Sequence, residues 1–412
     1  MLKNYFKIAI AVLKRRKFFT FISLFGISFT LTILMLGTAF LDKILSADYP
    51  DYKRDRSLYV GTMELKNTKE GWINRSNVSY YFLDHYVSTL KTIDKMAISS
   101  GTRTSNAYVN NKKIVIQYKY TNAAYWEVLE YKFLEGKPYT LAQINNAEKV
   151  AVISEETKKA YFGDKPNVVG LYISADNINY RVIGVVANVA ITMEKFAGDM
   201  YMPYTLSKED YKHVDLMGSY NAVLLAKTKA DVPKMKAEFD QMMKRVPLPS
   251  TEFDKVYCNA DYYLESLTRR IAGDGANSGL PVIIAIMTAC ILFFLLLPTI
   301  NLVNINITRI MERSSEIGVR KAFGASSKTL IYQFIVENMI LTFFGGLIGI
   351  VLTLITIRVI NGANWISNLH LSINLEVLGY SLATCLFFGL LSGVYPAWRM
   401  SRLNVVKALK SQ

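Results

Sequence analysis

Side chains that usually carry catalysis or bind metals are few in this chain and far apart. The three histidines and three cysteines are His85, His213, His370, Cys258, Cys290 and Cys385. None of them forms the close His or Cys spacing of a metal centre or a redox motif. The phosphate-binding pattern G-x-x-x-x-G-K-[ST] is also absent, because Gly136-Lys137 is followed by Pro138. We therefore expect a non-catalytic chain that itself binds no cofactor and no metal.

Charged residues at helical spacing gather instead in one short segment, and they are Arg313, Glu316, Arg320 and Lys321. Glu316 and Arg320 are four residues apart and therefore share one face of a helix. Gly324 is predicted to end this helix, and Ser326 or Ser327 to cap the next one. Such a helix could receive a push from a cytoplasmic protein. Its charge alone would equally suit a helix that lies on anionic lipid headgroups.

Four apolar stretches must position this segment, and they cover residues 18–41, 280–305, 341–360 and 378–397. Each approaches the roughly 20 residues that a helix needs to cross a bilayer. Backbone groups in lipid must be hydrogen-bonded internally, so we predict helices. The expected fold class is a membrane α-helical protein with four transmembrane helices, one plus three. A mixed α+β extracytoplasmic domain is expected at residues 42–279.

The distribution of positive charge predicts the orientation of these helices. Residues 1–17 contain six Lys or Arg residues and no acid, and segments 306–340 and 398–412 are also basic, whereas segment 361–377 contains no Lys or Arg. The positive-inside rule then places both termini and segment 306–340 in the cytoplasm, and 361–377 in a short external loop. The chain carries +15, but the 32 basic and 29 acidic residues of 42–279 leave only +3 there. This balance disfavours nucleic acid as a partner.

Two further features concern membrane contacts. Residues 1–17 form an amphipathic basic stretch that suits an interfacial helix at the inner leaflet, although the charge could act only as a topology determinant. We interpret 18–41 as a retained anchor, because no small-residue cleavage site follows it. Gly345 with Gly349, and Gly389 with Gly393, have the G-x-x-x-G spacing that allows close helix packing. That packing could lie within one chain or against a second copy.

Residues 42–279 show alternating or β-branched runs that predict strands at 112–120, 150–153, 180–186 and 222–226. Ser154 is predicted to cap a short helix that ends at Gly163, and Asp231 to cap a helix over 232–244. Segments 48–56 and 272–278, the second of which contains Gly and Asn, are predicted hinges.

Several segments together resemble a known family. EIGVRKAFGA at 316–325 and PAWRMSRLNVVKALK at 396–410 are similar to the FtsX/MacB-type permeases of ABC systems. AAYWEVL at 123–129, FLEGKP at 133–138, VAVIS at 150–154 and VIGVV at 182–186 resemble the MacB-like periplasmic core domain. The resemblance covers nearly the whole chain in the same order. MacB itself fuses an ATPase to its permease, and this sequence matches only the permease part.

The resemblance implies that a coupling helix docks into a separate ABC ATPase subunit, which would bind ATP and Mg²⁺. Its residues would be Arg313, Glu316, Gly318, Arg320, Lys321 and Gly324. Other implied partners are a second permease, identical or paralogous, membrane lipid, and a periplasmic adaptor or lipoprotein. The implied location is the bacterial inner membrane, as a multi-pass protein with both termini cytoplasmic.

Three functions remain open on the sequence. The first, which the large outer domain favours, is export or extraction of a substrate from the periplasm or the outer leaflet, driven by motion that the spans transmit. The second is FtsX-like signalling that regulates a periplasmic partner without transport, and the third is LolC/LolE-like lipoprotein release. The 316–325 segment disfavours a scaffold that is unconnected to ATP. The sequence does not indicate the substrate.

Overall fold

The computed structural model describes residues 10, 15, 17–109, 112–312, 319, 323, 326–363, 369–373, 376, 378–380, 382–383, 386–387 and 390. Two compact units make up the chain. The helical unit comprises Met1–Ile44, Ala285–Ile366 and His370–Gln412, and the second unit, here called the lobe, comprises Leu45–Ile284 and Ser367–Leu369.

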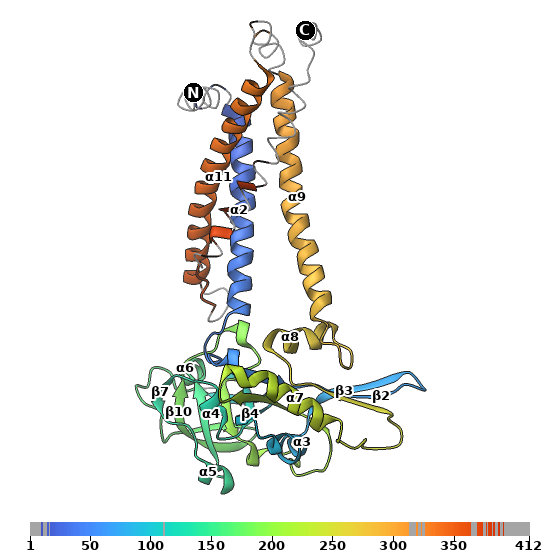
Figure 1. Cartoon of the computed structure of the whole chain (residues 1–412). Coiled ribbons are helices and arrows are strands. Elements are labelled where there is room, and N and C mark those ends of the chain that lie inside the picture. The colour runs from blue at the N-terminus through green and yellow to red at the C-terminus, as the bar shows by residue number, and fades with distance from the viewer. Residues whose placement is uncertain are drawn as a thin grey trace. The chain divides into compact units, whose positions relative to one another are not determined.

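The lobe mixes short helices with many strands (Figure 1). Its strands are β1 Ser57–Val60, β2 Met63–Asn67, β3 Trp72–Val78, β4 Ile93–Ser100, β5 Arg103–Val109, β6 Lys112–Thr121, β7 Phe133–Gly136, β8 Val150–Ser154, β9 Tyr172–Ala175, β10 Ile178–Val186, β11 Met200–Pro203, β12 Met217–Gly218, β13 Tyr220–Ala226 and β14 Lys255–Cys258. Its α-helices are α3 Tyr80–His85, α4 Tyr125–Val128, α5 Leu141–Asn145, α6 Glu155–Phe162, α7 Val232–Met243 and α8 Tyr263–Ala272. Short 3₁₀ turns are η1 Arg54–Arg56, η2 Val87–Thr89, η3 Ile191–Met193, η4 Tyr204–Leu206 and η5 Lys229–Asp231.

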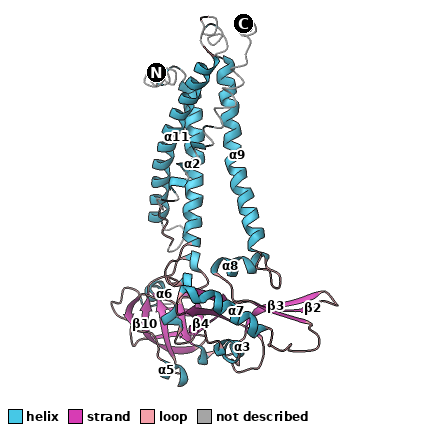
Figure 2. Ribbon diagram, in the orientation of Figure 1, coloured by secondary structure: helices cyan, strands magenta, loops and turns pink. Residues whose placement is uncertain are grey.

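The strands form one continuous hydrogen-bonded path in the order β14-β2-β3-β13-β4-β6-β11-β8-β10-β7. Strand β1 pairs with β13, and β5, β9 and β12 pair with β6, β10 and β3. Two pairs, β10 with β8 and β11 with β6, are parallel, and the other recorded pairs are antiparallel. Figure 2 shows α3 and α7 beside these strands. The lobe is therefore a mixed α/β domain, as the sequence predicts.

The core of the lobe consists of three apolar clusters. One packs Phe82 and Leu83 of α3 and Met235 and Phe239 of α7 against the sheet. The second is aromatic, and in it Tyr131 and Tyr201 both donate to the carbonyl of Phe196, at 2.7 and 2.9 Å. The third lies on strands β6, β8, β10 and β11. Because a domain of this size buries enough apolar surface on folding, it needs no disulfide to be stable.

Most of the predicted lobe elements are present, within a residue or two at their ends. The predicted strands are β6, β8, β10 and β13. The Ser154 hydroxyl accepts from the Thr157 amide at 3.1 Å and caps α6, which ends at Gly163 with φ of 67°. Asp231 is the residue before α7, as predicted, but its side chain makes no capping hydrogen bond. Asp231 precedes the helix in a helical conformation, and its carboxylate accepts from Thr228 Oγ1 at 2.6 Å instead.

In the helical unit, α2 (Lys17–Leu45) and α11 (Ser327–Ala363) lie side by side (Figure 1). One face of α2, which includes Ile27, Leu31 and Met35, is buried, while a row of phenylalanines on the other face is exposed: Phe18, Phe21, Phe25 and Phe29. Helix α9 covers Leu280–Glu312. An exposed aromatic row of this size is expected to face lipid rather than water.

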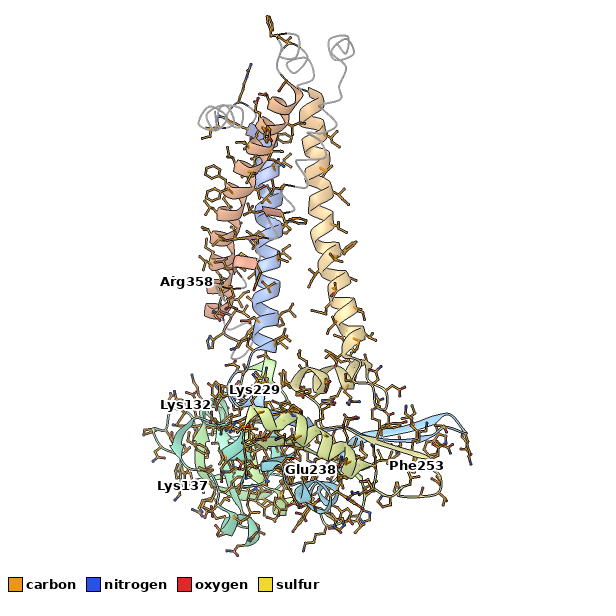
Figure 3. The ribbon with its side chains drawn as sticks, viewed as in Figure 1. Lys132, Lys137, Lys229, Glu238, Phe253 and Arg358 are labelled. Carbon is orange, nitrogen blue, oxygen red and sulfur yellow. The ribbon has the colours of Figure 1, made fainter. Side chains whose placement is uncertain are left out.

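Among the described residues, two helical stretches are long and apolar enough to cross a membrane, Thr20–Leu45 and Ile331–Ala363, and Leu280–Phe293 is a shorter apolar stretch. The structure therefore does not confirm the predicted count of four, since most of 378–397 lies outside the described residues. Helix α11 is also longer than the predicted span 341–360. It contains the buried Glu337 and, near its other end, Arg358, which Figure 3 labels.

Candidate functional site

The chain enters the lobe at Leu45, the last residue of α2, and α8 is the α-helix that precedes α9. An arginine near each of these positions, Arg54 and Arg269, donates hydrogen bonds to backbone carbonyls. An α-helix leaves its last carbonyls without intrahelical partners, and cations are favoured near them. At the end of α2, Arg54 Nη1 donates to the carbonyls of Leu45 and Ser46 at 2.9 and 2.7 Å. Arg54 therefore ties the last residue of α2 to the turn that enters the lobe.

Arg54 is held in turn by three neighbours within the lobe. Its Nε donates to Asp51 Oδ2 at 3.0 Å, and its guanidinium carbon lies 3.4 Å from the centre of the Tyr263 ring at the start of α8. Its Nη2 lies 3.2 Å from Met193 Sδ. A guanidinium over an aromatic face gains cation–π attraction as well as packing. The arginine therefore connects the first and last parts of the lobe sequence.

Asp51 is a buried carboxylate with two donors. It is 1% exposed, and Tyr59 Oη donates to the same Oδ2 at 2.7 Å. Burial raises the pKa of Asp51, against the lowering effect of the hydrogen bonds from Tyr59 and Arg54. Burial also raises the pKa of Tyr59, and Asp51 adds to that effect. The carboxylate therefore depends on these two donors to remain charged.

Tyr59 continues the connection through its backbone. Its amide donates to the Asp261 carbonyl at 2.8 Å, and the Asp261 amide donates back to the Tyr59 carbonyl at 2.9 Å. Asp261 is 3% exposed and its carboxylate forms a bidentate pair with Arg269, which is 6% exposed. Bidentate arginine–carboxylate pairs are among the strongest and most directional ion pairs in proteins.

Arg269 fixes the loop that leaves the lobe. Its Nη1 donates to the carbonyls of Gly275 and Asn277 at 2.8 and 3.2 Å. The Gly275 amide donates to Glu64 Oε1 at 3.0 Å, and Asn277 Oδ1 accepts from the Gly279 amide at 3.0 Å. An unbroken chain of contacts thus runs from Leu45 to Asn277, and we call Arg54, Asp51, Tyr59, Asp261 and Arg269 the base network.

Both segments that the sequence predicts as hinges form hydrogen bonds within the lobe. Segment 48–56 is fixed by Arg54 and Asp51, and Tyr49 Oη donates to the carbonyl of Ala187 at 3.0 Å. Segment 272–278 is fixed by Arg269 and Glu64. Their glycine, asparagine and charged residues predict segments that lack long regular secondary structure, and the structure agrees. The sequence does not show that buried arginines hydrogen-bond their carbonyls.

A cavity of about 680 Å³ adjoins the base network within the lobe. Tyr59, Asp261 and Tyr263 line it on one side, and Lys119, Lys195 and Arg270 contribute positive charge. Lys119 is 2% exposed, and its ammonium donates to the carbonyls of Glu194 and Lys195 at 3.4 and 2.6 Å. Burial, and then the charge of Lys195, lower the pKa of Lys119 to about 7. The Lys195 ammonium lies 4.6 Å from the centre of the Tyr59 ring, and burial lowers its pKa to about 8.

The predicted coupling residues Arg313, Glu316, Gly318, Arg320, Lys321 and Gly324 lie outside the described residues. Two residues between them are described. The Phe323 amide donates to the Val319 carbonyl at 3.0 Å, which is the i to i−4 bond of an α-helix. Their side chains are 88% and 45% exposed. The prediction for the next helix is confirmed, because Ser326 Oγ accepts from the Thr329 amide at 3.2 Å just before α11 begins.

Of the predicted packing glycines, Gly345 and Gly349 face α2, and Gly389 and Gly393 lie outside the described residues. A Cβ on Gly345 would lie 2.6 Å from Ile27 Cγ2, and one on Gly349 would lie 3.0 Å from Leu31 Cδ2. Thr32 of α2 also donates to the Gly349 carbonyl at 3.3 Å. These two glycines allow the backbones of α2 and α11 to approach within one chain.

Two protein-family models match this chain. Residues 20–242 match the MacB-like periplasmic core domain, and residues 288–405 match the FtsX-like permease C-terminal domain. The chain belongs to the MacB/FtsX-type ABC transporter permeases. The homologous segments therefore run through both units of this permease.

Curated relatives agree with this assignment. The permease is 24% identical over 336 residues to the ABC transporter permease YknZ of Bacillus subtilis. This match covers 80% of this chain and 79% of the relative. The permease is 27% identical over 292 residues to the pyoverdine export ATP-binding/permease protein PvdT of Pseudomonas fluorescens. That match covers 69% of this chain and 41% of the relative, so the permease spans about two fifths of the length of PvdT.

Solved structures of related domains are more distant. The periplasmic region of MacB from Actinobacillus actinomycetemcomitans matches with 17% identity and a TM-score of 0.37, over 55% of this chain and 97% of that one. The extracellular domain of YknZ matches with 13% identity and a TM-score of 0.34, over 43% and 88%.

Proposed function

We propose that this permease transmits ATP-driven motion from a separate ATPase subunit through its membrane helices to the lobe, for export or extraction of a substrate on the outer side. The coupling segment is residues 313–324, and the partner ATPase binds ATP and Mg²⁺. A second permease, identical or paralogous, completes the complex in the bacterial inner membrane, with the lobe outside and both termini in the cytoplasm.

The base network is the observation that supports this proposal. All of its residues lie in the lobe, where they hold the segment that follows α2 and the loop that precedes α9. Motion passed along a helix is lost if the segment that receives it is loose. At the α2 junction, Arg54 bonds the carbonyls of Leu45 and Ser46 to a buried carboxylate. At the junction before α9, Arg269 bonds the carbonyls of Gly275 and Asn277 to another. Buried ion pairs of this kind break only at a cost of several kcal/mol.

The name of the PvdT relatives supports the direction of transport in the proposal, since these proteins are described as exporting pyoverdine and as containing both ATP-binding and permease parts. Signalling without transport and lipoprotein release are alternatives that the base network does not separate from export. They differ in the outer partner, which an adaptor, a wall hydrolase or a lipoprotein recovered with the permease would identify.

The test begins with affinity purification of the full chain in detergent and mass spectrometry of the proteins that co-elute. We expect an ABC ATPase among them. ATP turnover of the reconstituted complex is then measured with the double variant Glu316→Lys and Arg320→Glu, which inverts both charges of the proposed docking face. Loss of the turnover that the permease stimulates, with normal membrane insertion, is the expected result.

The matched control is Lys137→Glu, which inverts an exposed charge on the lobe (Figure 3). We expect this variant to keep full stimulated turnover. Full turnover in the double variant would remove 313–324 from the transmission path, and the absence of any co-purifying ATPase would contradict the proposal as a whole.

A further inference from the structure

The cavity beside the base network has the size and composition of a ligand site. Ligand pockets commonly occupy about 300–1,000 Å³ and combine apolar walls with a few polar groups. This one has a volume of about 680 Å³ and lies wholly within the lobe. Its walls come from the sheet, from residues 192–196, which begin within η3, and from α8. A rigid sheet and a helix fixed by Arg269 therefore hold its shape.

The positive charges in the cavity are poorly compensated. Lys119 bonds only to backbone carbonyls, and among the described residues neither Lys195 nor Arg270 has a carboxylate within ion-pair distance. Of the two acidic residues in the lining, Asp261 is already neutralised by Arg269, and Glu194 is exposed. Arg270 is exposed, but burial lowers the pKa of Lys119 and of Lys195, and the charges of Asp51 and Asp261 offset only part of that effect at Lys195. An anion from solution would lower the cost of burying these charges.

Hydrogen-bond donors near these cations are also available. The buried Oγ1 of Thr192 has no hydrogen-bond partner among the described residues, although it belongs to the cavity lining. The side-chain amides of Asn77 and Asn221 line the same space. Buried polar groups in native proteins normally find a partner, in the protein, in water or in a ligand. An oxyanion could accept from such donors and from the lysines together.

The remaining wall is apolar and aromatic. It is formed by Tyr59, Phe196, Tyr263, Leu267 and Ile271. Ile271 on α8 is 76% exposed, so the apolar wall continues to the surface of the lobe. A small inorganic anion would leave this wall in contact with water, whereas an apolar chain or ring would cover it.

We propose that the cavity binds an amphiphilic anion, that is, a phosphate or carboxylate group attached to an apolar chain or ring. Lys119, Lys195 and Arg270 receive the anionic group, and the wall between Phe196 and Ile271 receives the apolar part. Binding of the anion does not require ATP coupling, so this proposal and the proposed function fail separately.

The test uses the full chain in phosphatidylcholine nanodiscs and measures binding by isothermal titration calorimetry. The probe is hexyl phosphate. Inorganic phosphate is a matched ligand without the apolar chain, and hexyl glucoside is a matched ligand without the charge. We expect hexyl phosphate to bind at least about tenfold more tightly than either, because each matched ligand loses one of the two kinds of contact, and about 1.4 kcal/mol corresponds to a factor of ten. Equal binding of inorganic phosphate or hexyl glucoside, or no binding of hexyl phosphate, would overturn the proposal.

The variants locate the site. Lys195→Met keeps the length of the side chain and removes its charge, and we expect it to weaken hexyl phosphate binding about tenfold or more. Arg270→Gln is the second variant, since Arg270 is exposed and its replacement does not disturb the core. Lys137→Met, an exposed lysine outside the cavity, is the control and should leave affinity unchanged. Equal losses in all three variants would place the binding elsewhere.

Two sources of such an anion are a membrane lipid and a soluble amphiphile. Nanodiscs that contain phosphatidylglycerol separate them. If the natural occupant is lipid, phosphatidylglycerol will compete and weaken hexyl phosphate binding in the wild-type chain. If it is soluble, the affinity will match that in pure phosphatidylcholine.

Discussion

Removal of Arg54 should loosen the junction between α2 and the lobe. In the variant Arg54→Met the side chain keeps much of its length but loses every donor. Asp51, 1% exposed, then retains only Tyr59 as a donor, and the carbonyls of Leu45 and Ser46 lose theirs. The perturbation is therefore an uncompensated buried carboxylate at a helix end.

The magnitude follows from the burial of each lost contact. Breaking a buried ion pair by removing one partner costs about 3–5 kcal/mol. The two carbonyls are near the surface and can bond to water, so they add little. Burial already raises the pKa of Asp51, and loss of the arginine raises it further, which allows the carboxyl group to protonate and limits the cost. We therefore expect the lower end, about 3 kcal/mol, which corresponds to about 100-fold more frequent local opening.

Hydrogen exchange with mass spectrometry on the full chain in nanodiscs measures this opening. Exchange of amides in 45–60 and 261–277 should accelerate about 100-fold, while amides in β8 and β10 stay protected. The matched control is Arg56→Met on the same turn, whose side chain makes one recorded hydrogen bond, to the carbonyl of Lys227 at 3.0 Å, and should cost less than about 0.5 kcal/mol.

A second variant separates charge from packing. Asp51→Asn combined with Arg54→Met removes the buried charge and keeps an acceptor for Tyr59, so it should recover more than half of the lost protection. If the amides of 45–60 and 261–277 exchange equally fast in Arg54→Met and in Arg56→Met, the base network does not stabilise these segments and the reasoning is refuted.

Two further predictions concern the helix contact and the cavity. Gly345→Ala should destabilise the detergent-solubilised permease by about 1–3 kcal/mol, because the new methyl group would lie 2.8 Å from Ile27 Cβ. Gly346→Ala, whose Cβ meets its nearest neighbour at 3.8 Å, should change the melting temperature little, and equal melting of the two variants would contradict the contact. Burial lowers the pKa values of Lys119 and Lys195 to about 7 and about 8, so in the unliganded lobe the free energy of unfolding should rise as pH increases from about 7 towards the unfolded-state lysine pKa. Hexyl phosphate affinity should fall over about the same range as these lysines lose their charge, and a calorimetric titration at several pH values that showed constant affinity would exclude them from the site. The other ionisable groups that line the cavity are Arg270, Glu194, Asp261, Tyr59 and Tyr263.

Local signals explain which parts of the lobe the sequence predicts. Strand β10 and helix α6 follow from β-branched runs and from the Ser154 and Gly163 caps, each of which lies within a few residues of the element that it defines. The Asp231 carboxylate accepts a hydrogen bond from Thr228 Oγ1 and none from the first amides of α7. A sequence pattern does not show which of these two local hydrogen bonds forms. Elements whose signals are local are therefore the ones that are predicted correctly.

The base network and the cavity depend on contacts far apart in the sequence. Arg54 meets Tyr263, and Glu64 meets Gly275, across about 210 positions. Lys119 lies in KKIVIQYKY, where a lysine in an alternating strand suggests a solvated face, yet it is 2% exposed because the segment after η3 covers it. A pattern along one strand does not show what covers that strand.

The base network fixes two segments of the lobe, 48–56 and 272–278. If these segments were loose, a displacement of α2 would be absorbed before it reached the sheet. Arg54 and Arg269 connect both segments to one pair of residues, Tyr59 and Asp261, whose backbones are bonded to each other in both directions. Tyr59, Asp261, Tyr263 and Met193 also line the cavity. A ligand there shifts a conformational equilibrium only as far as it binds the two states with different affinity. The cavity and the base network share these residues. If the proposed motion strains the network, it will therefore also change the shape of the site and its affinity for a bound anion.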